Sequence, residues 1–259
     1  MSENKFVSKF TVTEAVAVQQ LKDALPDILT EAFGSSDVYT LWTVLLDKSS
    51  EDDRIKVVLV KFLRARNLDI SAAKTMLINT LKWRKEFSAD TLLEETFDEQ
   101  AFNDSIGFLY KHDKEKRPVT YNFYGDLNQE TVFGDVNKFI RWRVQLMEKG
   151  IRDIDFVNTD TMVQVHDYKG ASMFGRTANA KEATNTIIKL MQDNYPEFLS
   201  SKIFVNVPKW GSIVFKLIRP LLSEATVKKF VICSNDELST TLLHHFNKED
   251  LPPVYAKQV

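Results

Sequence analysis

Short β-rich segments alternate with amphipathic helical segments from about residue 104 to the end of the chain. Alternation of this kind predicts an α/β fold with a largely parallel sheet and helical crossovers. The first two strands flank the charged turn HDKEK, so we expect them to form a hairpin. The expected strands are 106–111, 117–125, 162–168, 202–208 and 228–233, and the expected helices are 136–150, about 180–195 and 210–222.

The first hundred residues have a helical pattern instead. Residues 14–34 carry apolar side chains every three to four positions and stop at Gly34, and residues 53–87 predict two helices with Asp69 or Ser71 as the second N-cap. Leu77 and Leu81 mark the buried side of that second helix. The sequence therefore predicts two domains, a helical N-terminal lobe over 1–103 and an α/β domain over 104–259.

Composition excludes several classes of protein. Of the 259 residues, 44% are hydrophobic and 27% charged, which is ordinary for a globular protein. The net charge of −2 gives no basic surplus for nucleic acid. Cys233 is the single cysteine, which excludes an internal disulfide and fits a reducing compartment. Without a signal-peptide pattern or a long apolar run, we expect a cytoplasmic protein that contacts membranes peripherally.

Motifs for catalysis are scarce. The chain has eight glycines and no G-x-G-x-x-G, G-x-S-x-G or H-E-x-x-H pattern. The segment GASMFGRT, residues 170–177, resembles a phosphate-binding loop, but Arg176 replaces its lysine and bulky residues crowd it. We therefore predict that the protein is not an enzyme, with a nucleotide-dependent enzyme as the remote alternative.

The strand VQVHDYKG, residues 163–170, has an unusual polar face. Side chains alternate along a strand, so Gln164, His166 and Tyr168 share one face. Such a face is either a satisfied polar cluster in contact with water, or it lines something polar or metal-containing. The helix expected over 210–222 raises a similar question, because its apolar surface with a basic fringe suits a core helix, a lid over a cavity or a membrane surface.

Several segments together resemble the CRAL-TRIO lipid-binding family. They are VKFLRARNLDISAAKTMLINTLKWR, VHDYKG, NYPEFLSSKIFVNVP, FKLIRPLLSEATVKKF and LPPVY, in the family's order. The resemblance implies a helical lobe and a domain whose sheet is the floor of a hydrophobic lipid pocket, closed by a gating helix at 210–222. YGDL, KFIRWRVQLMEKG and QVHDYKG are most similar to fungal phosphatidylinositol transfer proteins of the haem-binding kind.

The resemblance implies a phosphatidylinositol ligand. The family's headgroup positions correspond here to Arg66, Glu197, Thr226 and Lys229, which suit inositol hydroxyls and phosphate. Two positions that are small hydroxyl residues in members that also carry phosphatidylcholine are Met162 and Gln164 here. We therefore expect phosphatidylinositol transfer without phosphatidylcholine transfer, in support of phosphoinositide homeostasis.

The same resemblance implies ferric b-type haem with Tyr168 as the axial ligand, since phenolate is one of the protein ligands of haem iron. His166 would hydrogen-bond the phenolate or contact the porphyrin. Tyr124, Arg143 and Lys202 match the positions that hold the propionates. Arg66 stands where the subclass can have a tyrosine. The partners implied by the resemblance are phosphatidylinositol, haem, and internal membranes such as the endoplasmic reticulum. The alternative to a lipid-transfer function is a haem-binding or stress-related protein with little lipid transfer.

Overall fold

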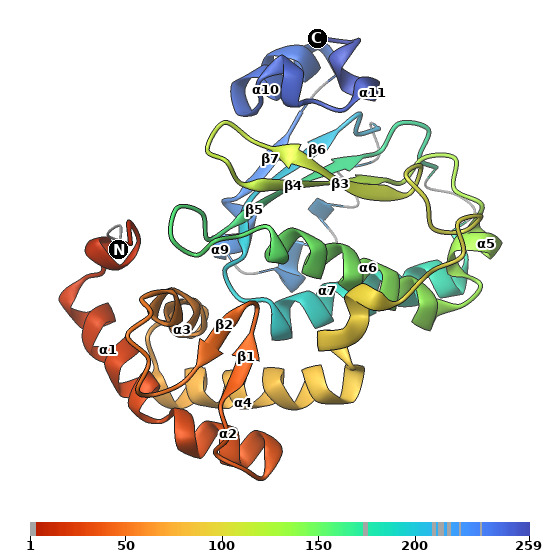
Figure 1. The fold of residues 1–259 in the computed structure, drawn as a ribbon. Helices are drawn as coiled ribbons and strands as arrows, with labels where there is room; N and C mark the ends of the chain where they lie inside the picture. The colour runs from red at the N-terminus through yellow and green to blue at the C-terminus, as the bar shows by residue number, and fades with distance from the viewer. Residues whose placement is uncertain are drawn as a thin grey trace. The chain divides into compact units, whose positions relative to one another are not determined.

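The computed structural model describes residues 4–172, 176–208, 211, 215–216, 219–222, 224–233 and 235–259. It contains two compact units (Figure 1). The first comprises 1–95, 154–160 and 187–198, and the second comprises 96–153, 161–186 and 199–259. Two segments of the first unit thus come from the part of the chain that the sequence-based division assigned to the second domain. The division at residue 103 stays a prediction.

The first unit begins with a single-turn 3-10 helix, Val7–Lys9, and two helices where the sequence predicted one. Helix α1, Val12–Asp23, starts with a capping box in which the Glu14 amide donates to the Thr11 hydroxyl and the Thr11 amide to the Glu14 carboxylate. Helix α2, Leu25–Phe33, has Pro26 in its first turn and ends at Gly34, where φ is +81°. Proline cannot donate the amide that would continue α1, which explains the break.

Helices α3, Arg54–Arg64, and α4, Ile70–Phe87, follow the sequence-based expectation. The Asp69 carboxylate accepts from the Ala72 amide at 2.9 Å, so Asp69 is the N-cap. Leu77 and Leu81 are fully buried, as their spacing predicted. A 3-10 helix, Ala89–Glu94, comes after α4.

A small hairpin in the first unit was missed by the helical interpretation of this region. Strands β1, Tyr39–Leu41, and β2, Val44–Leu46, pair in antiparallel fashion. The two turn residues, Trp42 and Thr43, both have positive φ, the geometry that such hairpins usually obtain from asparagine or glycine. Trp42 is buried against Phe62 and Phe198, so tertiary packing holds a turn that the local sequence does not favour.

The second unit has a five-stranded sheet in the order β3-β4-β5-β6-β7. The predicted hairpin is β3 and β4, and each later strand pairs in parallel with its neighbour. This confirms the predicted α/β fold with a helical N-terminal region and a mainly parallel sheet. The strands are β3, Gly107–His112; β4, Pro118–Phe123; β5, Met162–Asp167; β6, Leu199–Val205; and β7, Phe230–Ile232.

Four described helices lie between these strands in the chain: α5, Gln129–Phe133; α6, Val136–Arg152; α7, Ala178–Asn194; and α9, Glu224–Val227. Two more helices follow the last strand: α10, Leu238–His245, and α11, Pro253–Ala256. Three 3-10 turns, Arg219–Leu221, Asn235–Glu237 and Lys248–Asp250, complete the described elements. The gating helix expected over 210–222 lies largely outside the described residues, which leave out 209, 210, 212–214, 217 and 218.

The two faces of this sheet differ sharply. One face is an apolar core covered by the C-terminal helices α10 and α11, and α6 lies on the other side (Figure 1). Gly150 of α6 lies against this second face, with the end of the Met162 side chain close to its Cα. Sheet residues of the apolar core are Val119, Tyr121, Val163, Val165, Ile203 and Val205. The side chains at the alternate positions of these strands point to the second face. They include Thr120, Asn122, Gln164, His166 and Lys202.

Candidate functional site

Strand register brings the predicted polar residues together on one face of the sheet. Asn122 of β4 pairs with His166 of β5, and Gln164 of β5 pairs with Lys202 of β6. The expectation that Gln164 and His166 share a face is therefore confirmed. Tyr168 follows directly after β5, and its amide donates to the Val205 carbonyl at 3.0 Å, so the chain keeps the course of the strand. Five side chains form what we call the Tyr–His cluster: Tyr124 and Tyr168, which directly follow β4 and β5, His166 of β5, Lys202 of β6 and Arg143 of α6.

Three rings form the centre of the Tyr–His cluster. The Tyr124 hydroxyl lies 2.8 Å from His166 Nδ1. The rings of Tyr124 and Tyr168 stack with centroids 4.9 Å apart, and Tyr168 also stacks on Phe204. Burial lowers the pKa of His166 well below its usual value, and Lys202 and Arg143 lower it further. The imidazole is therefore neutral at physiological pH.

A chain of hydrogen bonds fixes the tautomer of His166. Its Nε2 lies 3.3 Å from Oε1, the side-chain amide oxygen of Gln164, which can only accept, so Nε2 carries the proton. Nδ1 must then accept from the Tyr124 hydroxyl. The Gln164 amide nitrogen in turn lies 3.8 Å from the sulfur of Met147 on α6. Both nitrogens of His166 are thus used in this structure, with Tyr124 and Gln164 as partners. A contact of His166 with the Tyr168 phenolate or the porphyrin of bound haem stays a prediction.

The Tyr168 hydroxyl differs from its neighbours. Within the described part of the chain it makes no hydrogen bond. Burial raises the pKa of Tyr168, whereas the charges of Arg176 and Arg143 oppose that rise. The phenol is therefore protonated when no ligand is bound, and its oxygen remains available to one.

Two glycine-containing loops hold the two tyrosines. The Tyr124 amide donates to the Asp167 carbonyl at 2.9 Å. A Cβ on Gly125 would lie 1.5 Å from the Lys169 carbonyl oxygen, so only glycine permits this approach. Gly170 has φ of +75° and packs against the Asp126 carboxylate. The YGDL and DYKG segments thus pack directly on each other, which explains how residues 44 positions apart come to stack.

Cationic side chains surround the Tyr–His cluster. Arg143 donates to the Asn122 side-chain oxygen, and its guanidinium lies 5.8 Å from the Trp142 ring. The Lys202 amine lies 5.7 Å from the Phe204 ring centre and 5.9 Å from that of Phe230. Burial, and secondly the charge of Arg143, lowers the pKa of Lys202 to about 7. Cations act on the pKa of all three groups: Lys202 and Arg143 on His166, Arg176 and Arg143 on Tyr168, and Arg143 on Lys202. Tyr124 opposes the two arginines at Tyr168 by raising its pKa. The positive charge around the cluster favours an anionic ligand.

We expect Lys202→Met to stabilise the ligand-free protein at pH 6. The folded-state pKa of about 7 lies below the ordinary lysine value of 10.5, so at pH 6 the fold keeps a charged amine in a poorly solvated place. From pH 7 towards 10.5 the unfolded chain binds more protons than the folded one, and wild-type stability rises with pH. Denaturant titration at pH 6 should therefore show that the free energy of unfolding of the variant exceeds that of wild type by about 1–2 kcal/mol. This difference should be smaller at pH 9. The exposed substitution Lys181→Met is the control, and a less stable Lys202→Met protein at pH 6 would contradict the assignment.

The sheet face becomes apolar beyond Lys202. Phe204 and Phe230 lie with ring centres 4.9 Å apart, and Phe215 lies 5.9 Å from Phe230. All three are half-buried, and Ile232 is 54% exposed. The face is thus amphipathic, with hydroxyl, imidazole and cationic groups over β4 and β5 and aromatic and aliphatic groups over β6 and β7. This aromatic half was not among the predicted site residues, although alternate positions in KIFVNVP and KKFVIC carry it.

The predicted headgroup residues fall in both units. In the first unit Arg66 lines an open groove of about 380 Å³ with Ser71, Thr75 and Asn79 of α4, and its guanidinium donates to the Ala65 carbonyl. Glu197, also in the first unit, has φ of +54°. In the second unit, the Lys229 carbonyl accepts from the Lys202 amide at 2.9 Å.

The fourth predicted headgroup residue, Thr226, belongs to α9. Its side chain lies outside the described residues. The assignment of Arg66, Glu197, Thr226 and Lys229 to a headgroup site stays a prediction.

The segment that resembles a phosphate-binding loop has a structural role where it is described. Residues 173–175 lie outside the described residues. Arg176, which stands in place of the lysine, donates to the Thr184 hydroxyl at 2.7 Å and to the Ala180 carbonyl at 3.3 Å. Both partners belong to α7, so Arg176 ties the loop to the helix that follows it.

Among the residues described, no group of three or more histidine, cysteine, aspartate or glutamate side chains is arranged to hold a metal ion. No helix in the described ranges is long and apolar enough to cross a membrane.

Comparisons with known proteins identify the family. The model of the CRAL/TRIO domain matches residues 102–255, and that of the CRAL/TRIO N-terminal domain matches 17–79. The chain is 37% identical to the phosphatidylinositol transfer protein SFH5 of Candida albicans, over 97% of this chain and 83% of that protein. SFH5 of Meyerozyma guilliermondii is also 37% identical, over 96% and 79%. A crystal structure of Sfh5 matches with a TM-score of 0.79 and 32% identity, over 90% of this chain and 84% of that chain.

Plant proteins match as well. Patellin-6 of Arabidopsis thaliana is 36% identical over 97% of this chain, and Patellin-5 is 38% identical over 98%. The chain spans 61% of the length of Patellin-6 and 38% of that of Patellin-5. The two domain models, the relatives and the five-stranded sheet agree, and the chain belongs to the CRAL/TRIO family.

Proposed function

We propose that this protein binds phosphatidylinositol and transfers it between membranes. The observation that carries the proposal is the amphipathic sheet face, with its cationic polar half at the Tyr–His cluster and its half-buried aromatic half at Phe204 and Phe230. A phospholipid combines an anionic headgroup with apolar chains, and apolar surface close to a few placed polar groups is what a lipid site needs. The printed function of the SFH5 relatives, phosphatidylinositol transfer, supports the same conclusion.

The four headgroup residues have suitable chemistry for this ligand. Glu197 would accept hydrogen bonds from inositol hydroxyls, and Arg66, Thr226 and Lys229 would donate to hydroxyl or phosphate oxygens. The groove beside Arg66 offers further hydroxyl and amide groups. A gating helix over 210–222 and a closed lipid pocket remain part of the proposal.

We further propose that phosphatidylcholine is not a ligand. Met162 is fully buried and packs against α6 at Gly150. Gln164 is engaged with His166 and Met147. Neither position offers a hydroxyl donor to a choline phosphate, and both side chains already have partners.

The Tyr–His cluster also fits ferric b-type haem. Tyr168 has an available hydroxyl, and Arg143 and Lys202 supply the positive charge that two propionates and a phenolate require. Tyr124 donates to His166, so its oxygen would accept from a ligand instead of donating to it. When bound, haem would supply a ferric centre whose phenolate ligand disfavours reversible oxygen binding. The proposed function is thus a lipid-transfer protein and not an enzyme, cytoplasmic and peripherally associated with the endoplasmic reticulum or other internal membranes.

The test is a vesicle assay on the purified full chain. Donor vesicles carrying labelled phosphatidylinositol or labelled phosphatidylcholine are mixed with unlabelled acceptors, and transfer is followed with and without protein. We expect transfer of phosphatidylinositol and no transfer of phosphatidylcholine above background. Equal transport of both lipids would overturn the predicted selectivity, and transport of neither would overturn the function.

The absorption spectrum distinguishes the second candidate, a haem-binding or stress-related protein with little lipid transfer. The observation that favours it is the available Tyr168 hydroxyl in a cationic site. A Soret band in protein from haem-replete cells, together with no phosphatidylinositol transfer, would support that candidate. Retention of a nucleotide through dialysis would support the remote alternative of a nucleotide-dependent enzyme.

A further inference from the structure

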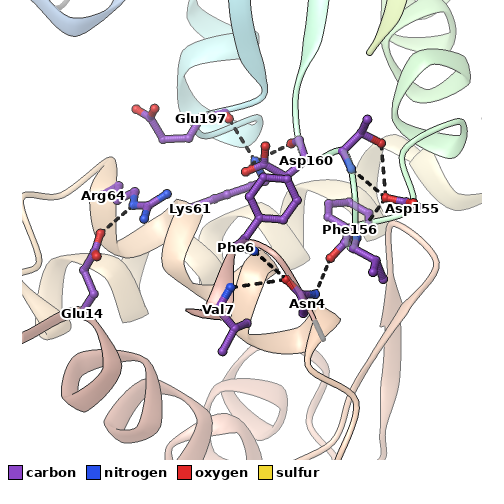
Figure 2. Close-up of polar contacts among 12 residues, drawn as sticks. Asn4, Phe6, Val7, Glu14, Lys61, Arg64, Asp155, Phe156, Asp160 and Glu197 are labelled. Atoms are coloured by element: carbon purple, nitrogen blue, oxygen red, sulfur yellow. Dashed lines mark hydrogen bonds and ion pairs between the residues drawn. The ribbon is translucent and has the colours of Figure 1, made fainter. Parts of the chain in front are cut away.

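A buried lysine joins three segments of the first unit. Lys61 of α3 has a side chain only 1% exposed. Its amine lies 2.5 Å from the Asp160 carbonyl oxygen, 3.1 Å from the Glu197 carbonyl oxygen and 3.2 Å from the Asp160 carboxylate (Figure 2). The same amine lies 4.7 Å from the ring centre of Phe198. One cation therefore connects α3 with loops that follow it by about a hundred residues or more in the chain.

Glu197, one of its partners, has an uncommon backbone conformation. Its φ of +54° lies in the left-handed region, which residues with a Cβ seldom adopt. Such a conformation persists only where the surroundings enforce it, and it is found preferentially at functional sites. Lys61 supplies part of this constraint directly, by donating to the carbonyl of Glu197 itself.

Aromatic contacts fix the chain on both sides of Glu197. Phe198 packs edge-on against Trp42 with centroids 4.6 Å apart, and it contacts Phe156 at 6.2 Å. Tyr195 lies edge-on to Trp83 at 5.8 Å. The segment Tyr195–Phe198 is thus held by its flanking rings, and Lys61 is the polar contact at its centre.

Lys61 contacts Glu197 through the main-chain carbonyl. Figure 2 shows the carboxylate extending away from the Lys61 amine, while the carbonyl points towards it. Lys61 forms a salt bridge with Asp160. The lysine thus orients the backbone from which the Glu197 side chain projects.

We infer that Lys61 is a positioning residue for the carboxylate of Glu197 in binding the inositol headgroup. The inference rests on the proposed function, in which that carboxylate accepts hydrogen bonds from inositol hydroxyls. Hydrogen-bond acceptance by a carboxylate depends on direction, so a backbone locked in one conformation keeps the headgroup affinity high. Loss of Lys61 lets the segment relax from the left-handed conformation and turns the side chain away.

The experiment is a double-mutant cycle on the full chain, with phosphatidylinositol transfer between vesicles and thermal unfolding as the two readouts. The variants are Glu197→Gln, Lys61→Met and the combination, and Lys61→Gln replaces Lys61→Met should the latter fail to fold. We expect each single variant to lower phosphatidylinositol transfer about tenfold. When Glu197→Gln is already present, adding Lys61→Met should lower transfer by less than a further twofold. The two losses do not add because both residues act through the same carboxylate. The fall in Tm caused by Lys61→Met should be the same in both backgrounds.

A control separates positioning from ordinary stabilisation. Asp160→Asn removes the charge that pairs with Lys61 but keeps the lysine and its bond to the Glu197 carbonyl, so transfer should stay within twofold of wild type. Equal losses of transfer from Lys61→Met in both backgrounds, or none, would overturn the inference. Wild-type transfer by Glu197→Gln would overturn the headgroup role of that carboxylate, and absence of transfer by the unmodified protein would overturn the proposed function itself.

Discussion

We expect Tyr168→Phe to abolish the Soret absorption that the proposed haem site gives protein purified from haem-replete cells, and to leave the proposed phosphatidylinositol transfer within about twofold of wild type. This is the expected result because the substitution removes one oxygen atom, the available hydroxyl of the Tyr–His cluster, and keeps the ring that stacks on Tyr124 and Phe204. A phenylalanine cannot ligate iron, whereas the neutral His166 already uses both of its nitrogens. Absorption spectra, haem content per chain and vesicle transfer measure the two activities separately.

Tyr110→Phe is the matched control for this experiment. Tyr110 is half-buried beside the apolar core on the opposite face of the sheet, so the same chemical change there should leave the Soret band intact. Tyr124→Phe is informative too, because it frees His166 Nδ1 while keeping the stacked ring. An unchanged Soret band in Tyr168→Phe would exclude Tyr168 as the ligand, and a colourless wild-type protein would exclude haem.

Asp167→Ala is expected to lower the free energy of unfolding by about 3–5 kcal/mol, the usual cost of leaving buried partners of a charged group unpaired. Asp167 is 4% exposed, and its carboxylate accepts from the Tyr255 hydroxyl at 2.7 Å, the Asn206 amide at 2.9 Å and the Lys169 backbone amide at 2.8 Å. Burial and the Asp167 charge raise the pKa of Tyr255, so this phenol remains a donor. The carboxylate therefore ties α11 and the end of β6 to β5.

Urea denaturation measures this loss, and protease digestion near α11 locates it. Asp167→Asn keeps an acceptor for the Lys169 amide and should lose about half as much stability. Tyr255→Phe removes a single donor, so it should cost about 1–2 kcal/mol and add little to Asp167→Ala. An Asp167→Ala protein within 1 kcal/mol of wild type would show that the network does not secure the C-terminal helix.

The strands and long helices could be predicted because each has a periodic pattern that its own residues carry. The alternation in 163–168 predicted the shared face of Gln164 and His166, and the short polar side chain of Asp69 predicted the start of α4. The β1–β2 hairpin could not be found in this way. Its turn uses Trp42 and Thr43 in left-handed conformations, which only packing of Trp42 against Phe62 and Phe198 supports.

The role of the Tyr–His cluster as a binding site stays a prediction, and its hydrogen bonds could not be read from the sequence. Four of its residues come from neighbouring strands or the residues directly after them, and Arg143 comes from α6. The pairing of His166 with Tyr124 depends on register between β4 and β5, and the engagement of Arg143 with Asn122 depends on the approach of α6. Neither partner is close in sequence, so no local pattern could select it.

By itself the sequence determined the α/β order of elements, the polar face of β5 and membership of a lipid-binding family, because these follow from local periodicity and from short motifs. Only the tertiary structure decided which hydroxyl of the Tyr–His cluster is available and why the pKa of Lys202 falls to about 7. It also decided that Lys61 holds the backbone of Glu197, 136 positions further along the chain. Burial and long-range hydrogen bonds arise from contacts between distant segments, and those contacts exist only once the chain has folded.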